Sequence, residues 1–478
     1  MRAEPVAATE ATAATVPTPH GPRWLLPAGA ALLLAVLAAW VADLVTHLSY
    51  LAAMRDLVVY RNGGLIVRHV SPAYDAHRAS PLYDWVGQHG VQFTYPPFAA
   101  VLFSVASVLS WTVMRWAMTV ASLAALGLSL WLVFGALSFP GGTTPPASGG
   151  DSPRPPYGRP AVRLGATLGV SALALATEPV QQTLSLGQVN LLLMLLIVAD
   201  LVTGGALIPG NRARWWHGIG IGIAAGVKLT PLIFIPYLLL TRRYRQAATA
   251  AGVFAATVAV GYAVLPGDSG TYWAHGLFLK ANRIVFLGTR GNQSLRGIAT
   301  RLAGSVSSGT VPWLAAAALV AVAGLVAAAL LYRARQPVPA MLACALTGLL
   351  VSPLSWDHHW VWVAPGLALL AHLGAVARRP AARAAWWAAG GGLFLVFACW
   401  PQFWNLPQSG LTPAGLGWYA PGTYFATGSK PWYHEFHWHG LQLLAGNSTV
   451  LAGLACLVAL VAAAASYLAR ERRREPGP

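Results

Sequence analysis

The residues best suited to chemistry lie in one short stretch, residues 54–64, which reads MRDLVVYRNGG. Its carboxylate, Asp56, lies between Arg55 and Arg61, and Tyr60 follows one helical turn later. A carboxylate at a membrane surface can act as a general base by taking a proton from an attacking hydroxyl. Flanking arginines would keep that carboxylate ionised and could also bind an anionic leaving group. The alternative is a surface salt bridge at the end of a hydrophobic span.

The composition is that of a membrane protein. Of the 478 residues, 56% are hydrophobic and only 9% are charged, which is typical of a polytopic chain rather than a soluble globule. The net charge of +17 would suggest nucleic acid in a soluble protein. Here, basic loops between spans explain it, because they fix orientation and meet anionic lipids. We therefore expect membrane lipids as partners and no nucleic acid.

Hydrophobic runs predict the fold. About 12 of them are long enough to cross a bilayer, with the shorter ones tolerated inside a bundle. We therefore predict an all-α, polytopic membrane helix bundle with about 12 transmembrane helices. The runs cover residues 24–47, 96–111, 113–137, 161–178, 189–207, 216–240, 246–265, 311–332, 338–352, 360–377, 384–400 and 449–468.

The ends of the chain frame one membrane domain. Residues 1–22 are rich in Ala, Thr and Pro and are predicted to be a disordered cytoplasmic tail. Residues 23–470 form the predicted domain, and residues 471–478 a basic cytoplasmic tail. The first span has no convincing cleavage site, so we expect it to be retained.

Basic clusters that follow the runs place both termini inside. Four loops then face outward together: 48–95, 266–310, 353–359 and 401–448. The first of these mixes apolar and polar residues in a pattern that predicts short interfacial helices.

Two basic loops do not fit this orientation. Two basic segments fall on the outer side: residues 138–160, which contain Arg154 and Arg159, and the pair Arg212 and Arg214. A re-entrant or broken helix between residues 96 and 240 would resolve the conflict, and the Gly-rich GIGIGIAAGVKLTP is a suitable place for the break.

Lys228 lies in GVKLTP, inside an apolar run. An ammonium there costs about 2.5–3.5 kcal/mol on insertion scales unless it is paired. It either snorkels to an interface or holds an anionic group such as a lipid phosphate in a cavity. In the same way, Gln188 and Asn190 in LGQVN begin a span, and their amides would bind sugar hydroxyls or hydrogen-bond between helices.

The outward loops supply further candidates. In SPLSWDHH, Trp356 could stack on a sugar ring, and one of His358 and His359 could donate to a phosphate or sugar oxygen. Adjacent histidines cannot both face one point on a helix, and the alternative is an interfacial belt of aromatic and His side chains. Loop 266–310 gathers polar donors, and FTYPP places an aromatic before a Pro-initiated helix. These remaining candidates are Arg290, Asn292, Gln293 and Tyr95.

Metal and thiol chemistry have little support in the sequence. His434, Glu435, His437 and His439 match no strong zinc spacing. The three cysteines, Cys344, Cys399 and Cys456, lie in apolar runs and are predicted to be core residues. No GxSxG, GxGxxG or Walker loop is present, which makes soluble nucleotide chemistry a poor fit.

Taken in order, six stretches between about residues 50 and 365 resemble the family-87 glycosyltransferases. These are polyprenol-phosphate-mannose-dependent α-(1→2)-mannosyltransferases of actinobacteria with the GT-C membrane fold. The stretches are RDLVVYRNGG, FTYPPFAAVLF, LSLGQVNLLL, GVKLTPLIFIPYLL, GNQSLRG and SPLSWDHH. The long Pro/Gly-rich loop 138–160 departs from the pattern and leaves the acceptor open.

The resemblance implies an inverting transfer of mannose from polyprenyl-phosphate mannose to a lipid-linked mannoside, at the outer face of the plasma membrane. It places the base on Asp56, and the groups near the lipid phosphate on Lys228 and one of His358 and His359. No nucleotide sugar, cofactor or obligatory metal is expected. Other candidates for the base are Asp75, Asp84 and Asp357.

Two alternatives to this function stay open. One keeps the fold and changes the sugar on the same carrier, for example to arabinofuranose. The other, from a different class, is a lipid or solute transporter. A transporter would need buried acids along a continuous polar path, whereas the polar groups here gather in the outward loops.

Overall fold

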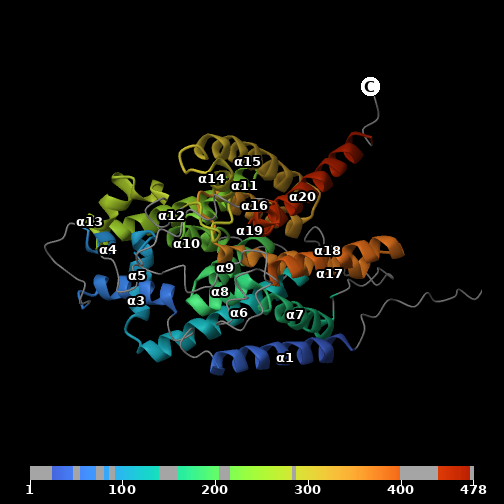
Figure 1. Cartoon of the computed structure of the whole chain (residues 1–478), viewed down its shortest axis with the longest axis horizontal. Coiled ribbons are helices and arrows are strands. Elements are labelled where there is room, and N and C mark those ends of the chain that lie inside the picture. Colours follow the sequence, from blue (N-terminus) through green and yellow to red (C-terminus); the bar gives the residue numbers. More distant parts are fainter. Residues whose placement is uncertain are drawn as a thin grey trace, which may run out of the picture.

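The structure is a computed structural model, and it is helical throughout its named elements (Figure 1). It describes residues 24–46, 54–70, 80–84, 92–138, 157, 159–203, 216–281, 287–398 and 440–473. Several features singled out above lie outside these residues: the N-terminal tail, residues 474–478, Asp75, Arg154, Arg212, Arg214, Cys399 and the His-rich part of loop 401–448. The start of the predicted C-terminal tail is described, and α20 continues into it as far as Arg472.

Each predicted hydrophobic run contains at least one helix. The longer helices are α1 (Leu25–Thr46), α6 (Trp111–Ser138), α7 (Pro160–Leu175), α9 (Asn190–Val202), α12 (Tyr244–Val264), α15 (Thr310–Arg333), α16 (Pro337–Val351), α17 (Val363–Val376), α18 (Pro380–Ala398) and α20 (Ser448–Arg472). The shorter ones are α3 (Arg55–Val67), α4 (Pro81–Asp84), α5 (Pro97–Ala106), α8 (Glu178–Leu186), α10 (Ile219–Val227), η2 (Thr230–Ile233), α11 (Phe234–Leu240), α13 (Pro266–Ser269), η3 (Gly270–Ala274), η4 (Leu277–Leu279), α14 (Leu295–Ala303), η6 (Asp357–Trp362) and α19 (Leu441–Gly446).

The protein is a multi-pass membrane protein. Within the described residues, six helices are long and apolar enough to span a bilayer, or seven if the bent pair α7–α8 counts as one span. Five more apolar helices, among them α5 and α9, are shorter than that. The described structure thus shows six or seven candidate spans, against the 12 predicted from the runs.

One predicted span, residues 216–240, is instead re-entrant. α10 runs alongside α12 in the same direction, because Gly218 meets the backbone of Gln246 and Gly226 meets Thr257. Helix α10 stops before Lys228, whose backbone is extended, and η2 and α11 lead the chain back to the start of α12. The segment therefore enters and leaves at the same end of the bundle. The predicted break in the Gly-rich stretch is confirmed, and Lys228 lies at the reversal.

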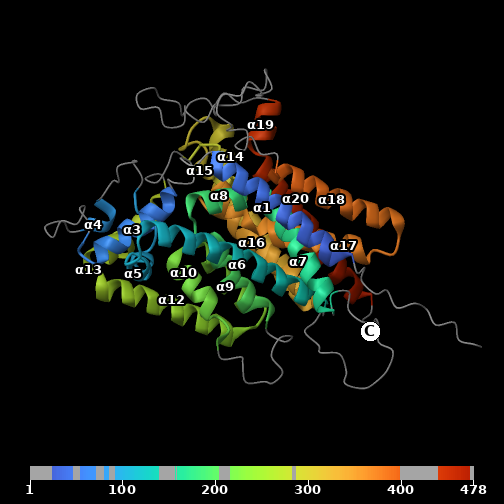
Figure 2. The ribbon, with the colours of Figure 1, turned by 90° about the horizontal axis from the view of Figure 1, so that it is seen from below.

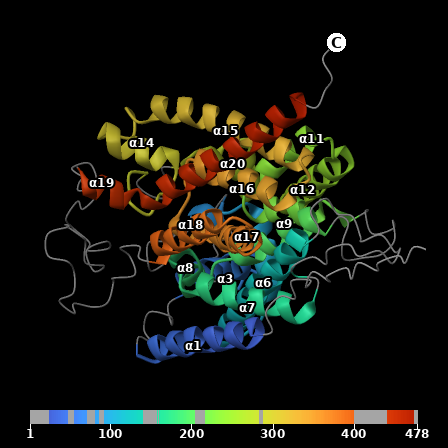
Figure 3. The same cartoon turned by 90° about the vertical axis from the view of Figure 1, so that its right-hand side faces the viewer.

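The packing of α1 against α7 decides the orientation of one of the basic loops. α1 and α7 lie side by side (Figure 3), with Leu25 against Gly165 and Gly29 against Gly169. The two helices therefore start at the same end of the bundle. Arg159, which precedes α7, therefore lies at the end where α1 begins, and the conflict that the sequence raised for residues 138–160 does not arise for it.

The short helices gather at the other end of the bundle. Figure 2 shows α3, α4, α8, α13 and α14 at one end of the long helices, away from the C-terminus. The prediction of short helices in residues 48–95 is confirmed by α3 and α4. α3 packs closely on α5 because Gly63 and Gly64 carry no side chain where they meet Phe93 and the backbone of Phe103. The glycine pair in RNGG thus sets how α3 lies.

Candidate active site

The junction between α8 and α9 forms the centre of the site. Helix α8 ends at Gly187, which adopts a left-handed conformation with φ of 68°, as helix-terminating glycines commonly do. A Cβ at Gly187 would lie 2.6 Å from the Cβ of Leu57 on α3. The missing side chain therefore lets the junction approach α3, and Gln188 follows directly beside Asp56.

The Gln188 amide bonds to Asp56 and to two tyrosines. Its Nε2 donates to Asp56 Oδ2 and, over 3.1 Å, to the Tyr95 hydroxyl, while its Oε1 accepts from the Tyr60 hydroxyl at 2.7 Å. Burial raises the pKa of both phenols well above the ordinary value, with the Asp56 charge adding to the effect. Both tyrosines are therefore neutral near pH 7, and Tyr60 serves as a donor.

Tyr95 is positioned from the short helices. The Tyr83 hydroxyl on α4 donates to the Tyr95 carbonyl at 2.7 Å. α4 is in turn held by Asp268 on α13, which accepts from the Ser80 hydroxyl and from the Leu82 N–H, each at 3.0 Å. The segment before α5 is thereby tied to α13, which follows the C-terminal end of α12.

Lys228 reaches the same amide from the other side. Its ammonium lies 3.0 Å from Gln188 Oε1, 2.7 Å from Asn190 Oδ1 and 3.3 Å from His359 Nε2. The ring of Tyr95 lies 5.5 Å away. Asp56 and Lys228 are thus separated by a single amide that contacts both, and each acts electrostatically on the other.

The Lys228 ammonium is buried without a direct ion-pair partner. The residue is only 8% exposed, and among the described residues no carboxylate forms a salt bridge with it. A buried cation bonded to neutral groups is costly, and a bound anion would relieve the cost. Lys228 and His359 also line a cavity whose walls are mostly apolar, including Leu193, Met194, Phe234, Leu349 and Trp362. The cavity therefore combines one cationic side chain with a mostly apolar lining.

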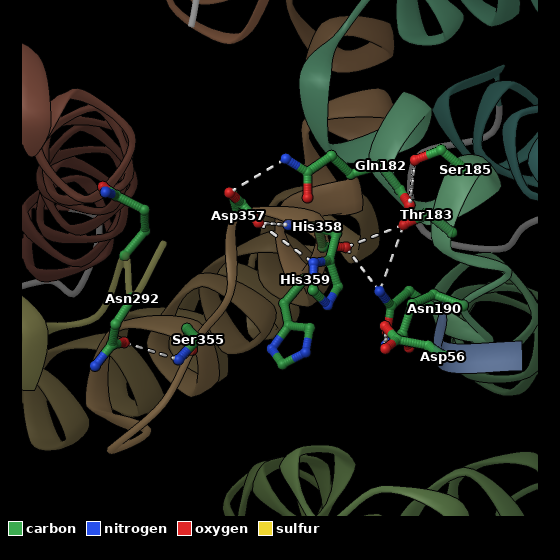
Figure 4. A network of polar contacts seen from close by, with 12 residues as sticks. Asp56, Gln182, Thr183, Ser185, Asn190, Asn292, Ser355, Asp357, His358 and His359 are labelled. Atoms are coloured by element: carbon green, nitrogen blue, oxygen red, sulfur yellow. Dashed lines mark hydrogen bonds and ion pairs between the residues drawn. The ribbon is translucent and has the colours of Figure 1, made fainter. Parts of the chain in front are cut away.

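The two adjacent histidines play different parts. The His359 ring faces Lys228, whereas the His358 ring is nearly parallel to the Trp356 ring, 6.1 Å away. Figure 4 shows bonds converging on the His358 carbonyl, which accepts from Asn190 at 2.7 Å and from Thr183 at 3.1 Å. The expectation that the two rings do not point the same way holds, and His359 is the one beside the cation.

Residues 287–293 form a loop held mainly by bonds to backbone. Asn292 and Gln293 are both fully buried. The Asn292 side chain bonds to backbone groups of Leu287, Pro353 and Ser355. The Gln293 side chain bonds to backbone groups of Arg290, Gly446 and Val450. Both amides, predicted to bind substrate, are thus engaged with the protein.

Arg301 secures the same loop and was not selected from the sequence. Its guanidinium donates to the carbonyls of Gly288, Thr289 and Asn292 and to the Asn447 side chain. Only its place in the amphipathic stretch LRGIATRLA hinted at a buried role. Arg301 joins the loop to the start of α20.

Arg290 belongs to a second charged group. It is 7% exposed and acts electrostatically on Glu178, which also interacts with Asp357. Asp357 accepts from the His358 N–H at 2.9 Å. Glu178 was likewise not selected, although a buried acid at the start of α8 is a recognisable signal in so apolar a chain.

The structure therefore brings together seven of the predicted site residues and separates others. Arg290, Asn292 and Gln293 lie in the loop of residues 287–293, and Arg55 and Arg61 flank Asp56 along α3. Trp356 directly precedes η6 and His358 lies within it, with its ring nearly parallel to that of Trp356. The described residues contain no cluster of three or more His, Cys, Asp or Glu side chains that could hold a metal ion. The seven are Asp56, Tyr60, Tyr95, Gln188, Asn190, Lys228 and His359.

In this helical membrane bundle, an acid and a buried cation without an ion-pair partner lie on either side of one amide, beside an apolar cavity. This arrangement is suited to an enzyme that acts on a lipid-linked substrate. Residues 93–353, more than half of the chain, match the model of glycosyltransferase family 87. The chain belongs to glycosyltransferase family 87, as its motifs predicted.

Mannosyltransferases of mycobacteria are similar over much of the chain. A polyprenol-phosphate-mannose-dependent alpha-(1-2)-phosphatidylinositol mannoside mannosyltransferase of Mycobacterium tuberculosis is 35% identical over 59% of this chain and 62% of its own length. The corresponding pentamannoside mannosyltransferase of that species is 33% identical over 76% of both chains. The pentamannoside enzyme of Mycolicibacterium smegmatis is 32% identical over 76% of this chain and 80% of its own.

Proposed function

We propose that this protein is an inverting mannosyltransferase that moves mannose from polyprenyl-phosphate mannose to a hydroxyl of a phosphatidylinositol mannoside or lipomannan-type acceptor, forming an α-(1→2) linkage. The observation that carries the proposal is the buried, unpaired ammonium of Lys228 beside an apolar cavity and one amide away from Asp56. The relatives' names supply the donor and the type of acceptor.

The donor is an anion on an apolar tail, and the residues that line the cavity have the chemistry to bind both parts. The phosphate would accept hydrogen bonds from Lys228 and His359, and the first isoprene units would lie against Phe234 and Trp362. Charge-assisted hydrogen bonds to phosphate in a buried site are strong, because water no longer competes for the donors. Lys228 also stabilises the negative charge that grows on the phosphate as the leaving group departs.

Asp56 acts on the other reactant. The acceptor hydroxyl oxygen attacks the anomeric carbon from the face opposite the phosphate, and the Asp56 carboxylate takes the hydroxyl proton. The anomeric C–O bond breaks at the same time, and its electron pair remains on the phosphate oxygen. One displacement inverts the anomeric centre, so a β-linked donor gives an α-linked product. Gln188 holds the acid at the start of α3, where a hydroxyl can approach.

The site is proposed to face the extracytoplasmic side of the plasma membrane, within a GT-C-type membrane domain. In support, basic residues gather at the opposite end. There, the Arg243 guanidinium carbon lies 5.2 Å from the centroid of the Tyr332 ring, and Arg333 and Arg335 follow Tyr332 in the chain. Such clusters are typical of the cytoplasmic end. Family membership favours transfer chemistry over the transporter alternative.

The test is transfer by the purified chain with labelled polyprenyl-phosphate mannose and a phosphatidylinositol mannoside acceptor. We expect a labelled product whose new linkage is α-(1→2), established by NMR. A parallel reaction with polyprenyl-phosphate arabinofuranose distinguishes the other sugar. Transfer from GDP-mannose without the lipid carrier, or retention of the donor's anomeric configuration, would contradict the proposal.

A further inference from the structure

Gln188 lies between the two charged groups on which the proposed reaction depends. We infer that Gln188 is a positioning residue, which holds the Asp56 carboxylate and keeps it out of direct contact with the Lys228 ammonium. This inference rests on the proposed function. It replaces the expectation that the Gln188 amide binds a sugar hydroxyl.

The orientation of the Gln188 amide follows from its partners. Lys228 can only donate, so the amide atom 3.0 Å from its ammonium is the oxygen. The Tyr60 hydroxyl donates to that same oxygen. The nitrogen must then face Asp56 and the Tyr95 hydroxyl. The amide therefore presents N–H to the anion and oxygen to the cation, which is the arrangement that favours both charges.

All four hydrogen-bonding positions of this amide are used by the protein. An amide has two N–H donors and two acceptor lone pairs, and Gln188 has two partners at each end. The side chain is also only 2% exposed. A sugar hydroxyl could bind Gln188 only by displacing one of these partners. Its bonds serve to hold protein groups in place.

The separation matters because a direct ion pair would weaken both charges. A carboxylate bonded to an ammonium is a weaker base, and an ammonium bonded to a carboxylate attracts a phosphate less strongly. A neutral amide between them leaves an oxygen of Asp56 for the acceptor hydroxyl. It also leaves the Lys228 ammonium bonded only to neutral groups, one of which the donor phosphate can displace. Gly187 fixes this arrangement, because its close approach to Leu57 sets the position of Gln188 beside Asp56.

The experiment is a double-mutant cycle between Gln188 and Asp56 with both kcat and KM measured. Gln188→Met keeps the volume but removes every hydrogen bond, and we expect kcat to fall about 100-fold through misplacement of the base. In an Asp56→Asn background, the same change should lower the residual kcat much less. The matched control is Gln246→Met, a buried glutamine that bonds to the Asp200 carbonyl far from the site. We expect its kcat to stay near the wild-type value.

A second variant covers the possibility that Gln188→Met does not fold. Gln188→Glu keeps the shape and the acceptors for Tyr60 and Lys228 but presents an oxygen to Asp56, and kcat should fall comparably. Independent, multiplying losses in the cycle, or a change confined to the KM for acceptor, would overturn the inference in favour of sugar binding. Full activity of Asp56→Asn alone would instead overturn the proposed base, whatever Gln188 does.

Discussion

Replacing Lys228 with methionine should separate stability from activity. In the protein without substrate, the ammonium bonds only to neutral groups in an apolar setting. Removing it relieves a burial cost of about 2.5–3.5 kcal/mol on insertion scales. It also leaves Gln188 Oε1 and Asn190 Oδ1 short of one donor, which costs about 1–3 kcal/mol. The two effects nearly offset each other, so the thermal midpoint of Lys228→Met should stay close to that of the wild type.

The same substitution should sharply weaken use of the donor. Truncating one partner of a buried, hydrogen-bonded charge pair costs about 2–5 kcal/mol, which corresponds to roughly a 30- to 5,000-fold loss in kcat/KM for polyprenyl-phosphate mannose. A polyprenyl phosphate should raise the thermal midpoint of the wild type but not that of the variant. Lys280→Met is the control, because Lys280 is an exposed lysine at the end of η4.

Two results would refute this reasoning. An unchanged donor KM in Lys228→Met, together with a preserved shift by polyprenyl phosphate, would show that the phosphate binds elsewhere. A large fall in the thermal midpoint of the substrate-free variant would show that Lys228 stabilises the fold itself. In either case the unpaired ammonium would not be the donor site.

Three further predictions concern the groups around the site. Gly187→Ala should abolish transfer because its Cβ would meet Leu57, whereas Gly304→Ala, also at positive φ but in open space, should lose only about 1–2 kcal/mol of stability and keep its activity. Arg301→Lys should lower the thermal midpoint, measured in detergent, because one ammonium cannot serve the carbonyls that the guanidinium reaches; an unchanged midpoint would contradict the role of Arg301. Burial raises the pKa of Asp268 to about 6, above its unfolded value of about 4. The stability that the protonated Asp268 contributes is therefore fully present below about pH 4, and it is lost as the pH rises through 6. Thermal midpoints across this range should fall less in Asp268→Asn than in the wild type, and parallel curves would rule the effect out.

The sequence located the helices well because hydrophobic length is a local property. It also located the break in GIGIGIAAGVKLTP, since glycines and an isolated lysine in an apolar run both argue against a continuous span. It did not show that the chain reverses at Lys228. That depends on α10 packing parallel to α12 through Gly218 and Gly226, and such packing is set by residues far along the chain.

The sequence could predict those site residues whose type alone indicates their chemistry. Asp56 and Lys228 stand out because charges are rare in this chain, and the structure places both against Gln188. The roles of the amides were less predictable, because an amide binds backbone, ligand or side chain equally well. Gln188 meets Asp56 across 132 residues, and Asn292 meets Ser355 across 63. Only the fold decides such pairings.

The most direct test of the central claim is the single-turnover rate of Asp56→Asn with bound polyprenyl-phosphate mannose and acceptor. Loss of a general base should slow transfer by about 10²- to 10⁴-fold while the donor still binds at Lys228. Asp84→Asn, at the end of α4, should transfer at the wild-type rate. Undiminished transfer by Asp56→Asn would contradict the account, and a loss in Asp84→Asn instead would move the base to that residue.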